Sequence, residues 1–225
     1  MKKIIVGITL AMATTLSAQI DFRSTRFGVL AGGNYSRVSN AHNPSGPLYS
    51  FQAGVLAQIP IDQYDQFFIQ PEITYYGAGE SGKDKDMKGS KGYDAKYANN
   101  YLSVPIYFKA FFSEAESEFF GLFGPRFNFL LNQKVTNPSR DVYYPEGGAP
   151  YADNPSINGK ANSFNWGLSG GVGYSYKRQF EIFARYDYGI GNTYPNMVEN
   201  KSGDPNTESR KSEQVFTVGL SYIFE

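Results

Sequence analysis

Apolar and polar residues alternate with a period of two along most of the chain beyond residue 25. In the segment 213–224, for example, Phe, Val, Leu and Tyr fill one set of alternate positions, and Thr, Gly and Ser are gathered on the other. Since neighbouring side chains of a β-strand point to opposite faces, this pattern predicts a strand with one apolar face and one smaller, more polar face. The segment 162–176 repeats the pattern, and its many glycines disfavour a helix.

Eight runs of this kind predict eight strands. Each run has about 10 to 15 residues, whereas strands of soluble proteins average about 5 to 6 and tilted membrane-crossing strands need about 9 to 11. Their length therefore favours strands that cross a membrane. The runs are 26–38, 49–60, 67–78, 99–112, 119–131, 162–176, 180–190 and 213–224.

The connections between these runs alternate strictly between long and short. In an up-and-down meander every second connection lies at the same end, so one end has tight turns and the other has long loops, as in outer-membrane barrels. We therefore expect an all-β fold, an eight-stranded antiparallel up-and-down transmembrane β-barrel with both termini at the periplasmic, short-turn end. The short connections are 61–66, 113–118 and 177–179, and the longer ones are 39–48, 79–98, 132–161 and 191–212.

Residues 1–18 have the pattern of an export signal. Two lysines precede an apolar run from Ile4 to Ala13, and small residues follow up to Ala18. A short N-terminal helix or anchor is the alternative, but the run is too short to cross a bilayer, and the absence of Cys excludes a lipoprotein anchor. No other segment is long and apolar enough for a transmembrane helix. We expect a signal peptide at 1–18 and one barrel domain at 19–225.

Composition narrows the functional classes. The 225 residues include 21 Lys and Arg and 21 Asp and Glu, and this zero net charge argues against a nucleic-acid partner. The chain has no Cys and one His, which excludes disulfides, zinc–thiolate centres, cysteine nucleophiles and multi-His metal sites. We expect no cofactor. A mean hydropathy of −0.41 argues against a helical membrane protein, while 18 Tyr and 18 Phe form an aromatic excess that needs a cause.

Side-chain size predicts which face of the barrel meets lipid. An eight-stranded barrel is just wide enough to be filled by side chains, so the bulky face fits outside and the face of Gly, Ser, Asn and Gln fits inside. The alternative, a secreted lipocalin-like barrel, would leave an apolar exterior in water. Outward aromatic residues near strand ends would then form girdles in contact with outer-membrane lipid. They are Tyr35, Tyr75, Trp166, Tyr174 and Tyr188.

Strand parity predicts a lumen that holds charges, amides and phenyl rings. Its three acids and three bases balance, and they can pair, as buried charges must. A structural plug of salt bridges is the first interpretation, and an ion or proton pathway is the second. The charged set is Glu72, Lys109, Arg126, Glu181, Arg185 and Asp187, with Gln52, Gln58, Gln70, Asn128, Phe111, Phe120 and Phe183 as inward neighbours.

The segment Tyr101–Lys109 reads YLSVPIYFK and resembles the YLxIPLxxK strand of the PorT-type outer-membrane β-barrel family of Bacteroidota. The resemblance implies an outer-membrane location and an aromatic C-terminal signal at Tyr222 and Phe224, which the barrel-insertion machinery reads. The member that gave this family its name is implicated in protein secretion. The resemblance therefore also implies secretion-system proteins as partners. Further segments similar to that family are 27–34, 121–126, 166–173, 184–189 and 218–224.

Candidate chemistry is sparse, and we expect a protein that is not an enzyme. His42 lies in a predicted loop and has no nucleophile motif beside it. Asp84 and Asp86 stand among lysines, which disfavours a calcium loop, so no metal site is expected.

The long loops are the remaining functional surface. The connection 132–161 carries Tyr143, Tyr144 and Tyr151 among Gly, Asn and Pro, and exposed Tyr supplies rigid contact area for a partner. The sequence leaves four hypotheses open. The first is a structural or interaction protein that meets cell-surface partners through long extracellular loops. The others are a component of a secretion assembly, a narrow channel, and an enzyme with His42 as its general base.

Overall fold

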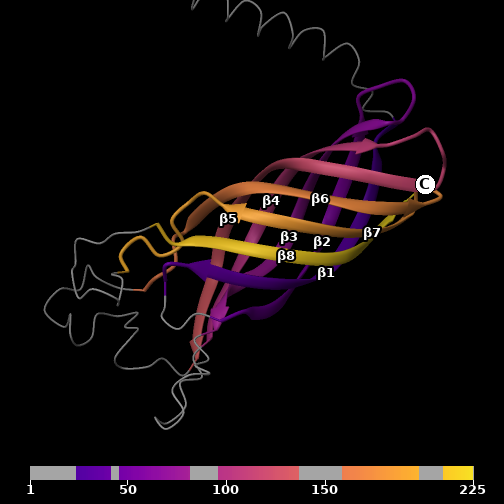
Figure 1. Cartoon of the computed structure of the whole chain (residues 1–225). Coiled ribbons are helices and arrows are strands. Elements are labelled where there is room, and N and C mark those ends of the chain that lie inside the picture. Colours follow the sequence, from indigo (N-terminus) through magenta and orange to yellow (C-terminus); the bar gives the residue numbers. More distant parts are fainter. Residues whose placement is uncertain (1–23, 42–45, 82–95, 137–158, 198–209, 225) are drawn as a thin grey trace, which may run out of the picture.

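The computed structural model describes residues 24–41, 46–81, 96–136, 159–197 and 210–224. Eight antiparallel strands follow one another around a closed barrel (Figure 1), so the predicted eight-stranded antiparallel barrel is confirmed. Among the described residues, no helix is long and apolar enough to span a membrane. The strands are β1 (Arg26–Ser39), β2 (Leu48–Pro60), β3 (Phe67–Ser81), β4 (Lys96–Phe111), β5 (Glu118–Thr136), β6 (Phe164–Tyr176), β7 (Phe180–Gly189) and β8 (Ser212–Ile223).

Several features of the sequence lie outside the described residues. These are the predicted signal peptide at 1–18, His42, the acidic pair Asp84 and Asp86, and the loop tyrosines Tyr143, Tyr144 and Tyr151.

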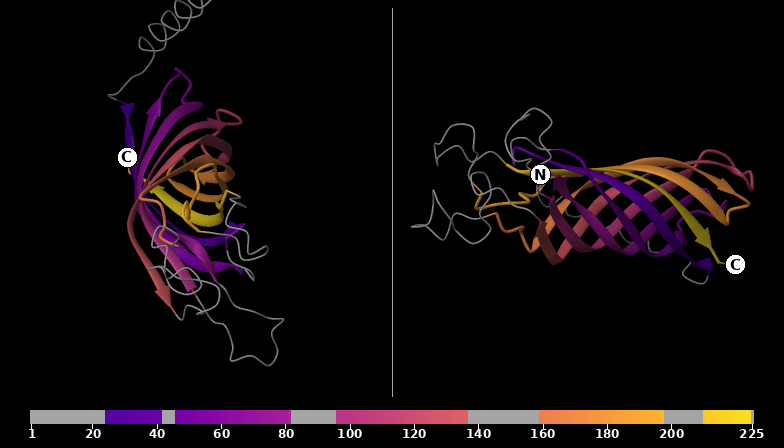
Figure 2. Two further views of the ribbon diagram at one scale, coloured as in Figure 1. Left: turned by 90° about the vertical axis from the view of Figure 1, so that its left-hand side faces the viewer. Right: turned by 90° about the horizontal axis from the view of Figure 1, so that it is seen from below.

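The first and last strands close the barrel along their whole length. The register of β1 on β8 runs from Gly28 opposite Ile223 to Ser39 opposite Ser212, and the other edge of β1 pairs with β2. The right-hand view of Figure 2 shows the closed barrel from the side, with its strands tilted relative to the barrel axis. Because both edges of β1 are occupied by neighbouring strands, the seam leaves no open edge there for another chain to extend.

The two ends of the barrel differ as the connection lengths predict. The short turns 61–66, 112–117 and 177–179 lie at one end, together with Arg26 and Phe224, and we call this the short-turn end. The strand ends that border the longer connections lie at the opposite, long-loop end. In the three-residue turn 177–179 the Gln179 amide donates to the Tyr176 carbonyl at 3.1 Å, and Lys177 and Arg178 have positive φ angles of 53° and 55°, as the two central residues of a type I′ turn require.

Three strands extend farther at the long-loop end than the sequence pattern predicts. The predicted ends at residues 78, 99 and 131 are in fact Ser81, Lys96 and Thr136, in β3, β4 and β5. The added residues lack apolar alternation, and they are held by cross-strand pairing, with Lys96 between Ser81 and Thr136. Gly79 fits this extension because its φ is 129° and any Cβ there would collide with the Tyr97 carbonyl oxygen.

The wall of the barrel separates two kinds of surface. Inside, an apolar cluster near the short-turn end includes Phe68, Phe111, Phe120 and Phe183, all buried. Outside, the same strands expose large apolar side chains; Phe123, for example, is 58% exposed. The inner face of the sheet therefore forms the packed core, which fills the lumen. The apolar side chains of the outer face are exposed to the surroundings of the barrel.

Candidate functional site in the barrel lumen

Strand β7 organises the charges of the lumen. Its inward positions are Glu181, Phe183, Arg185 and Asp187, and each charged side chain forms an ion pair with a different strand. The partners are Lys109 of β4, Glu72 of β3 and Arg126 of β5.

The pair nearest the short-turn end joins Lys109 and Glu181, with 2.5 Å between Nζ and Oε1. Glu181 also accepts hydrogen bonds from Gln58 at 3.3 Å and from the Ser221 hydroxyl at 2.9 Å. The ammonium of Lys109 lies 4.0 Å from the centre of the Phe120 ring. Both charges are therefore compensated on several sides, as burial requires.

The middle pair spans the barrel. Arg185 donates two hydrogen bonds to the carboxylate of Glu72, at 2.8 and 2.9 Å, in the forked geometry that makes arginine–carboxylate pairs strong. Gln70 donates a further hydrogen bond to Glu72 at 2.7 Å. The guanidinium of Arg185 lies 4.0 Å from the centre of the Phe183 ring, so its flat face is covered too.

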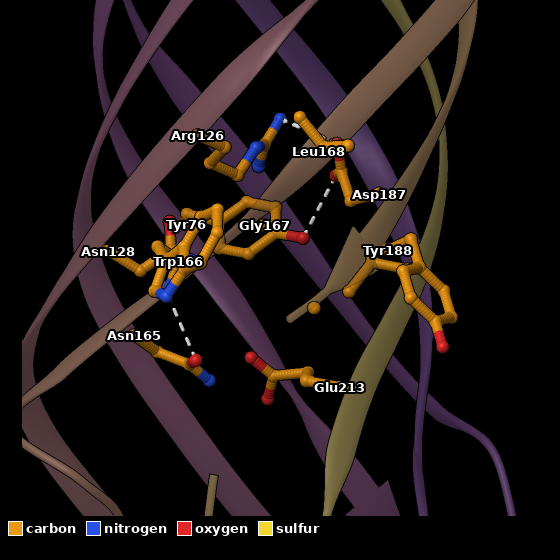
Figure 3. A pocket seen from close by; sticks show the side chains of 12 residues that line it. Tyr76, Arg126, Asn128, Asn165, Trp166, Gly167, Leu168, Asp187, Tyr188 and Glu213 are labelled. Atoms are coloured by element: carbon orange, nitrogen blue, oxygen red, sulfur yellow. Dashed lines mark hydrogen bonds and ion pairs between the residues drawn. The ribbon is translucent and has the colours of Figure 1, made fainter. Parts of the chain in front are cut away.

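The third pair lies toward the long-loop end and is shown in Figure 3. Arg126 lies 3.2 Å from Asp187, donates to the Tyr107 hydroxyl at 2.9 Å, and covers the ring of Tyr76 at 4.3 Å. The Tyr76 hydroxyl donates to Asp187 at 3.0 Å. A small cavity of about 20 Å³ adjoins this group, with Glu213 on its wall, and is large enough for one water-sized molecule.

All six charged residues singled out from the sequence thus lie in the lumen, where each is at most 5% exposed. Their inward amide neighbours Gln52, Gln58, Gln70 and Asn128 are buried as well. The sequence pattern missed three further buried charges at the long-loop end, Glu80, Lys211 and Glu213. Strand parity could have found Glu213, but Glu80 and Lys211 lie outside the predicted strands.

Arg178 covers the short-turn mouth, a role that no pattern in the sequence indicates. Its guanidinium donates to the backbone carbonyls of Asp65 at 2.8 Å and Ala115 at 3.1 Å, and to the Glu118 carboxylate at 2.5 Å. It also lies flat against the ring of Phe111, at 3.6 Å. Partial burial lowers the pKa of the Arg178 guanidinium, and the Glu118 carboxylate opposes that shift. One side chain therefore ties the three short turns together.

The long-loop mouth is covered by the segment that follows β7. Tyr194 and Met197 turn inward and pack against Val38 and Tyr97. The ammonium of Lys211 donates to the Met197 carbonyl at 2.6 Å, and the Asn99 amide donates to the Tyr194 hydroxyl at 3.1 Å. Burial, aided by the nearby Glu80 carboxylate, raises the pKa of Tyr194 well above its ordinary value. We call residues 190–197 the inner cap.

The aromatic residues predicted for the girdles face outward. Tyr35, Trp166 and Tyr188 lie toward the long-loop end, and Tyr174 lies near the short-turn end. Tyr75 lies near the middle of β3 rather than near its end, because that strand runs past the predicted residue 78 to Ser81. Three of the five pack against other outward rings: Tyr35 against Tyr49, Tyr75 against Phe51 and Tyr174 against Phe119, at 5.4, 5.2 and 5.1 Å between ring centres.

The C-terminal aromatic residues also lie on the outside of the barrel. The ring of Tyr222 contacts Phe180 and Phe224, at 4.7 and 5.5 Å between ring centres. The backbone amide of Phe224 donates to the Phe27 carbonyl at 2.7 Å, which fixes the last strand beside the first.

Within the described parts of the chain, no three His, Asp or Glu side chains are grouped closely enough to hold a metal ion. The lumen charges face one another rather than an open cavity. The arrangement is therefore suited to filling and bracing the barrel.

Solved structures similar to this chain are barrels of low sequence identity. The attachment invasion locus protein Ail of Yersinia pestis is 10% identical with a TM-score of 0.42, over 88% of this chain and 98% of Ail. Neisserial surface protein A is 17% identical with a TM-score of 0.42, over 88% and 97%. A major outer membrane protein of Thermus thermophilus is 17% identical with a TM-score of 0.46, over 89% and 100%.

No curated protein matches the sequence. The family described as outer membrane protein beta-barrel domain matches residues 17–194, which is most of the chain. This match supports a location in the outer membrane and agrees with the closed antiparallel barrel. The chain belongs to the outer membrane protein beta-barrel domain family.

Proposed function

We propose that the protein is a closed, non-conducting membrane anchor that acts by binding partners at its long-loop end. The observation that carries this proposal is the filling of the lumen. Three ion pairs occupy the middle, Arg178 and the phenyl cluster occupy the short-turn mouth, and the inner cap occupies the long-loop mouth. An ion would have to break buried, paired charges to pass, which is costly.

In this proposal the strands cross the outer membrane with the long loops outside and both termini in the periplasm. The outward apolar belt would meet the hydrocarbon, and the aromatic residues toward both ends would lie at the two interfaces. Residues 1–18 would direct export, and the outward Tyr222 and Phe224 would serve as the signal for the barrel-insertion machinery.

The partners in this proposal are proteins. The loop tyrosines of 132–161 suit contact with cell-surface proteins, and the PorT-type resemblance of Tyr101–Lys109 favours secretion-system proteins as a second class. A barrel with a filled lumen can serve either class, because binding would use the loops or the turns rather than the interior.

Conductance tests the closed lumen. The purified barrel in planar bilayers should give no single-channel steps, under conditions in which a porin of known conductance does. Steady openings of the wild-type barrel would overturn the proposal and favour a channel.

The absence of native cysteine allows a clean test of orientation. Lys160→Cys at the long-loop end should react with a membrane-impermeant maleimide in intact cells, since Lys160 is exposed. The matched variant Glu116→Cys, in an exposed short turn, should react only after the outer membrane is permeabilised. Labelling in the reverse order would show that the long loops face the periplasm.

A further inference from the structure

One of the three ion pairs in the lumen is incompletely hydrogen-bonded. The pairs made by Lys109 and Arg185 contain direct hydrogen bonds, at 2.5 Å and at 2.8 and 2.9 Å. In the third pair Nη2 of Arg126 lies 3.2 Å from Oδ1 of Asp187, and that oxygen accepts no hydrogen bond from any described residue. Nε and Nη1 of Arg126 likewise have no partner among the described residues. Since buried polar atoms nearly always have a partner, these atoms need one.

The cavity beside this pair extends to a third charged side chain. Arg126, Asp187 and Glu213 all line it, and Figure 3 shows Glu213 reaching inward from its strand toward the pair. Glu213 is 4% exposed, and its carboxylate accepts a hydrogen bond from the Asn99 amide at 3.5 Å, a long distance for such a bond. The cavity volume of about 20 Å³ exceeds the roughly 10–15 Å³ that one water molecule requires.

The wall of the cavity carries charges of both signs, which determines what can occupy it. Arg126 offers only hydrogen-bond donors, whereas an ionised Asp187 or Glu213 offers only acceptors. The guanidinium would repel a monovalent cation, and the two carboxylates would repel an anion. A neutral molecule with one heavy atom that both donates and accepts fits this wall, and water is such a molecule. A buried water typically makes about three hydrogen bonds, and three side chains are present for it.

We propose that this cavity is a binding site for one internal water molecule, which accepts a hydrogen bond from Arg126 and donates to Asp187 and Glu213. The water completes the ion pair that lacks a direct hydrogen bond, and it gives the buried carboxylate of Glu213 a second donor. This inference goes beyond the proposed function, because it concerns the interior of the barrel and is independent of which end faces outward.

The water links the middle of the lumen to the long-loop mouth. On one side of it, Arg126 donates to the Tyr107 hydroxyl at 2.9 Å. On the other side, the Asn99 amide donates to Glu213 at 3.5 Å and to the Tyr194 hydroxyl of the inner cap at 3.1 Å. The hydrogen bonds from the inner cap to the Arg126–Asp187 pair are therefore continuous only through the water.

A crystal structure of the purified wild-type barrel, at a resolution that shows ordered water, tests the inference. Crystals are grown in matched solutions that contain rubidium or bromide, whose anomalous scattering marks monovalent cations and halides. We expect one peak in the cavity, within about 2.7–3.2 Å of Arg126 and of both carboxylates, and no anomalous signal there in either crystal. An unoccupied cavity, a peak that contacts only one of the two charge signs, or an anomalous signal of rubidium or bromide would overturn the inference.

Two substitutions of Glu213 separate its acceptor oxygen from its bulk. Glu213→Gln keeps an acceptor for the water, whereas Glu213→Leu has a similar size and none. We expect the peak to remain in the first variant and to be lost in the second. The unfolding equilibrium constant of Glu213→Leu should be at least about tenfold larger than that of Glu213→Gln, because Arg126 and Asp187 also lose the water.

Gln58→Leu is the matched control. It also removes a buried polar side chain, but Gln58 lies beside Glu181 toward the short-turn end, so the peak should remain. Retention of the peak in Glu213→Leu, or its loss in Gln58→Leu, would show that Glu213 does not hold the water. The wild-type crystals need no variant, so their result decides the inference even if a substitution prevents folding.

Discussion

Arg185 and Glu72 form a two-armed ion pair between opposite walls of the barrel, with nitrogen–oxygen distances of 2.8 and 2.9 Å. β3 and β7 are four positions apart in the ring of eight strands, so this contact crosses the full width of the lumen. Each residue is 2% exposed. The pair therefore acts as a brace that has almost no contact with water.

Removing one member of this brace should be far more costly than removing both. Arg185→Leu leaves Glu72 buried and unpaired, and we expect a loss of about 3–5 kcal/mol in the free energy of unfolding. The double variant Arg185→Leu with Glu72→Leu should recover most of that loss. Urea unfolding in lipid vesicles, followed by the fluorescence of Trp166, the single tryptophan, measures both.

The exposed pair Arg26–Asp65 is a suitable control for that experiment. Its side chains are 34% and 47% exposed and 2.6 Å apart. Solvent screening limits such pairs, so Arg26→Leu should cost no more than about 1 kcal/mol. If the double variant Arg185→Leu with Glu72→Leu were as unstable as Arg185→Leu alone, the loss would not come from an unpaired Glu72, and this account of the ion pair would be wrong.

A second prediction concerns the phenyl rings that pack in the lumen against the backbone of a glycine, which has no side chain in their way. Gly173 lies between Phe120 and Phe183 on one rung, and a Cβ there would collide with the Phe120 ring and the Ile182 carbonyl. Gly173→Ala should lower the free energy of unfolding by about 1–3 kcal/mol through overpacking. Gly121→Ala is the control, because its Cβ would meet Phe112 at 3.6 Å, an ordinary contact. Equal effects of the two substitutions would refute this account.

A third prediction concerns Arg178 at the short-turn mouth. Arg178→Ala removes hydrogen bonds to two other turns and to Glu118, and should cost about 1–3 kcal/mol. Hydrogen exchange of the amides in 62–66 and 113–117 should become faster. Arg178→Lys should rescue only part of the protection, since an ammonium keeps the charge but loses the flat fork. Unchanged exchange in both turns would show that they hold without the Arg178 contacts.

A fourth prediction follows from the raised pKa of Tyr194 in the inner cap. In the unfolded chain this hydroxyl ionises near pH 10, while burial keeps it protonated to higher pH in the folded chain. Its contribution is therefore complete below about pH 10 and is lost as pH rises toward the folded pKa, at about 1.4 kcal/mol per pH unit.

The comparison with Tyr194→Phe isolates that contribution. Urea unfolding at several pH values from 8 to 11 should show the wild type losing stability faster than the variant above pH 10. Parallel curves across the whole range would mean that the Tyr194 hydroxyl ionises as freely in the folded protein as in the unfolded chain.

The period of two was sufficient to predict the eight strands and the inward position of the charges. Prolines inside the runs did not disturb it: Pro71 and Pro125 are half-buried wall residues, and Glu72 and Arg126 beside them still face the lumen. At these prolines the alternation survives because each strand is held on both sides by neighbours, which fixes its register. It is interrupted in β5, where the register shifts by one residue between Leu130 and Asn132.

The period of two could not predict which charges pair. Contacts such as Arg185 with Glu72 depend on the tilt and stagger of the closed barrel, which single strands do not encode. The same holds for the extension of β5 to Thr136, which depends on pairing with β4. Arg178 and Tyr194 lie in connections, where no periodicity marks a side chain that folds back to cover a mouth.

The dependence of three ion pairs on β7 has a consequence for assembly. Until β7 takes its place, the charges on β3, β4 and β5 lack their partners, and a half-formed sheet would hold them against lipid or an empty interior at high cost. The ring of strands is complete only when β7 is seated, because β8 pairs with β1 on one edge and with β7 on the other. Membrane insertion of this barrel should therefore be cooperative, with neutralisation of the interior and closure of the ring as a single event.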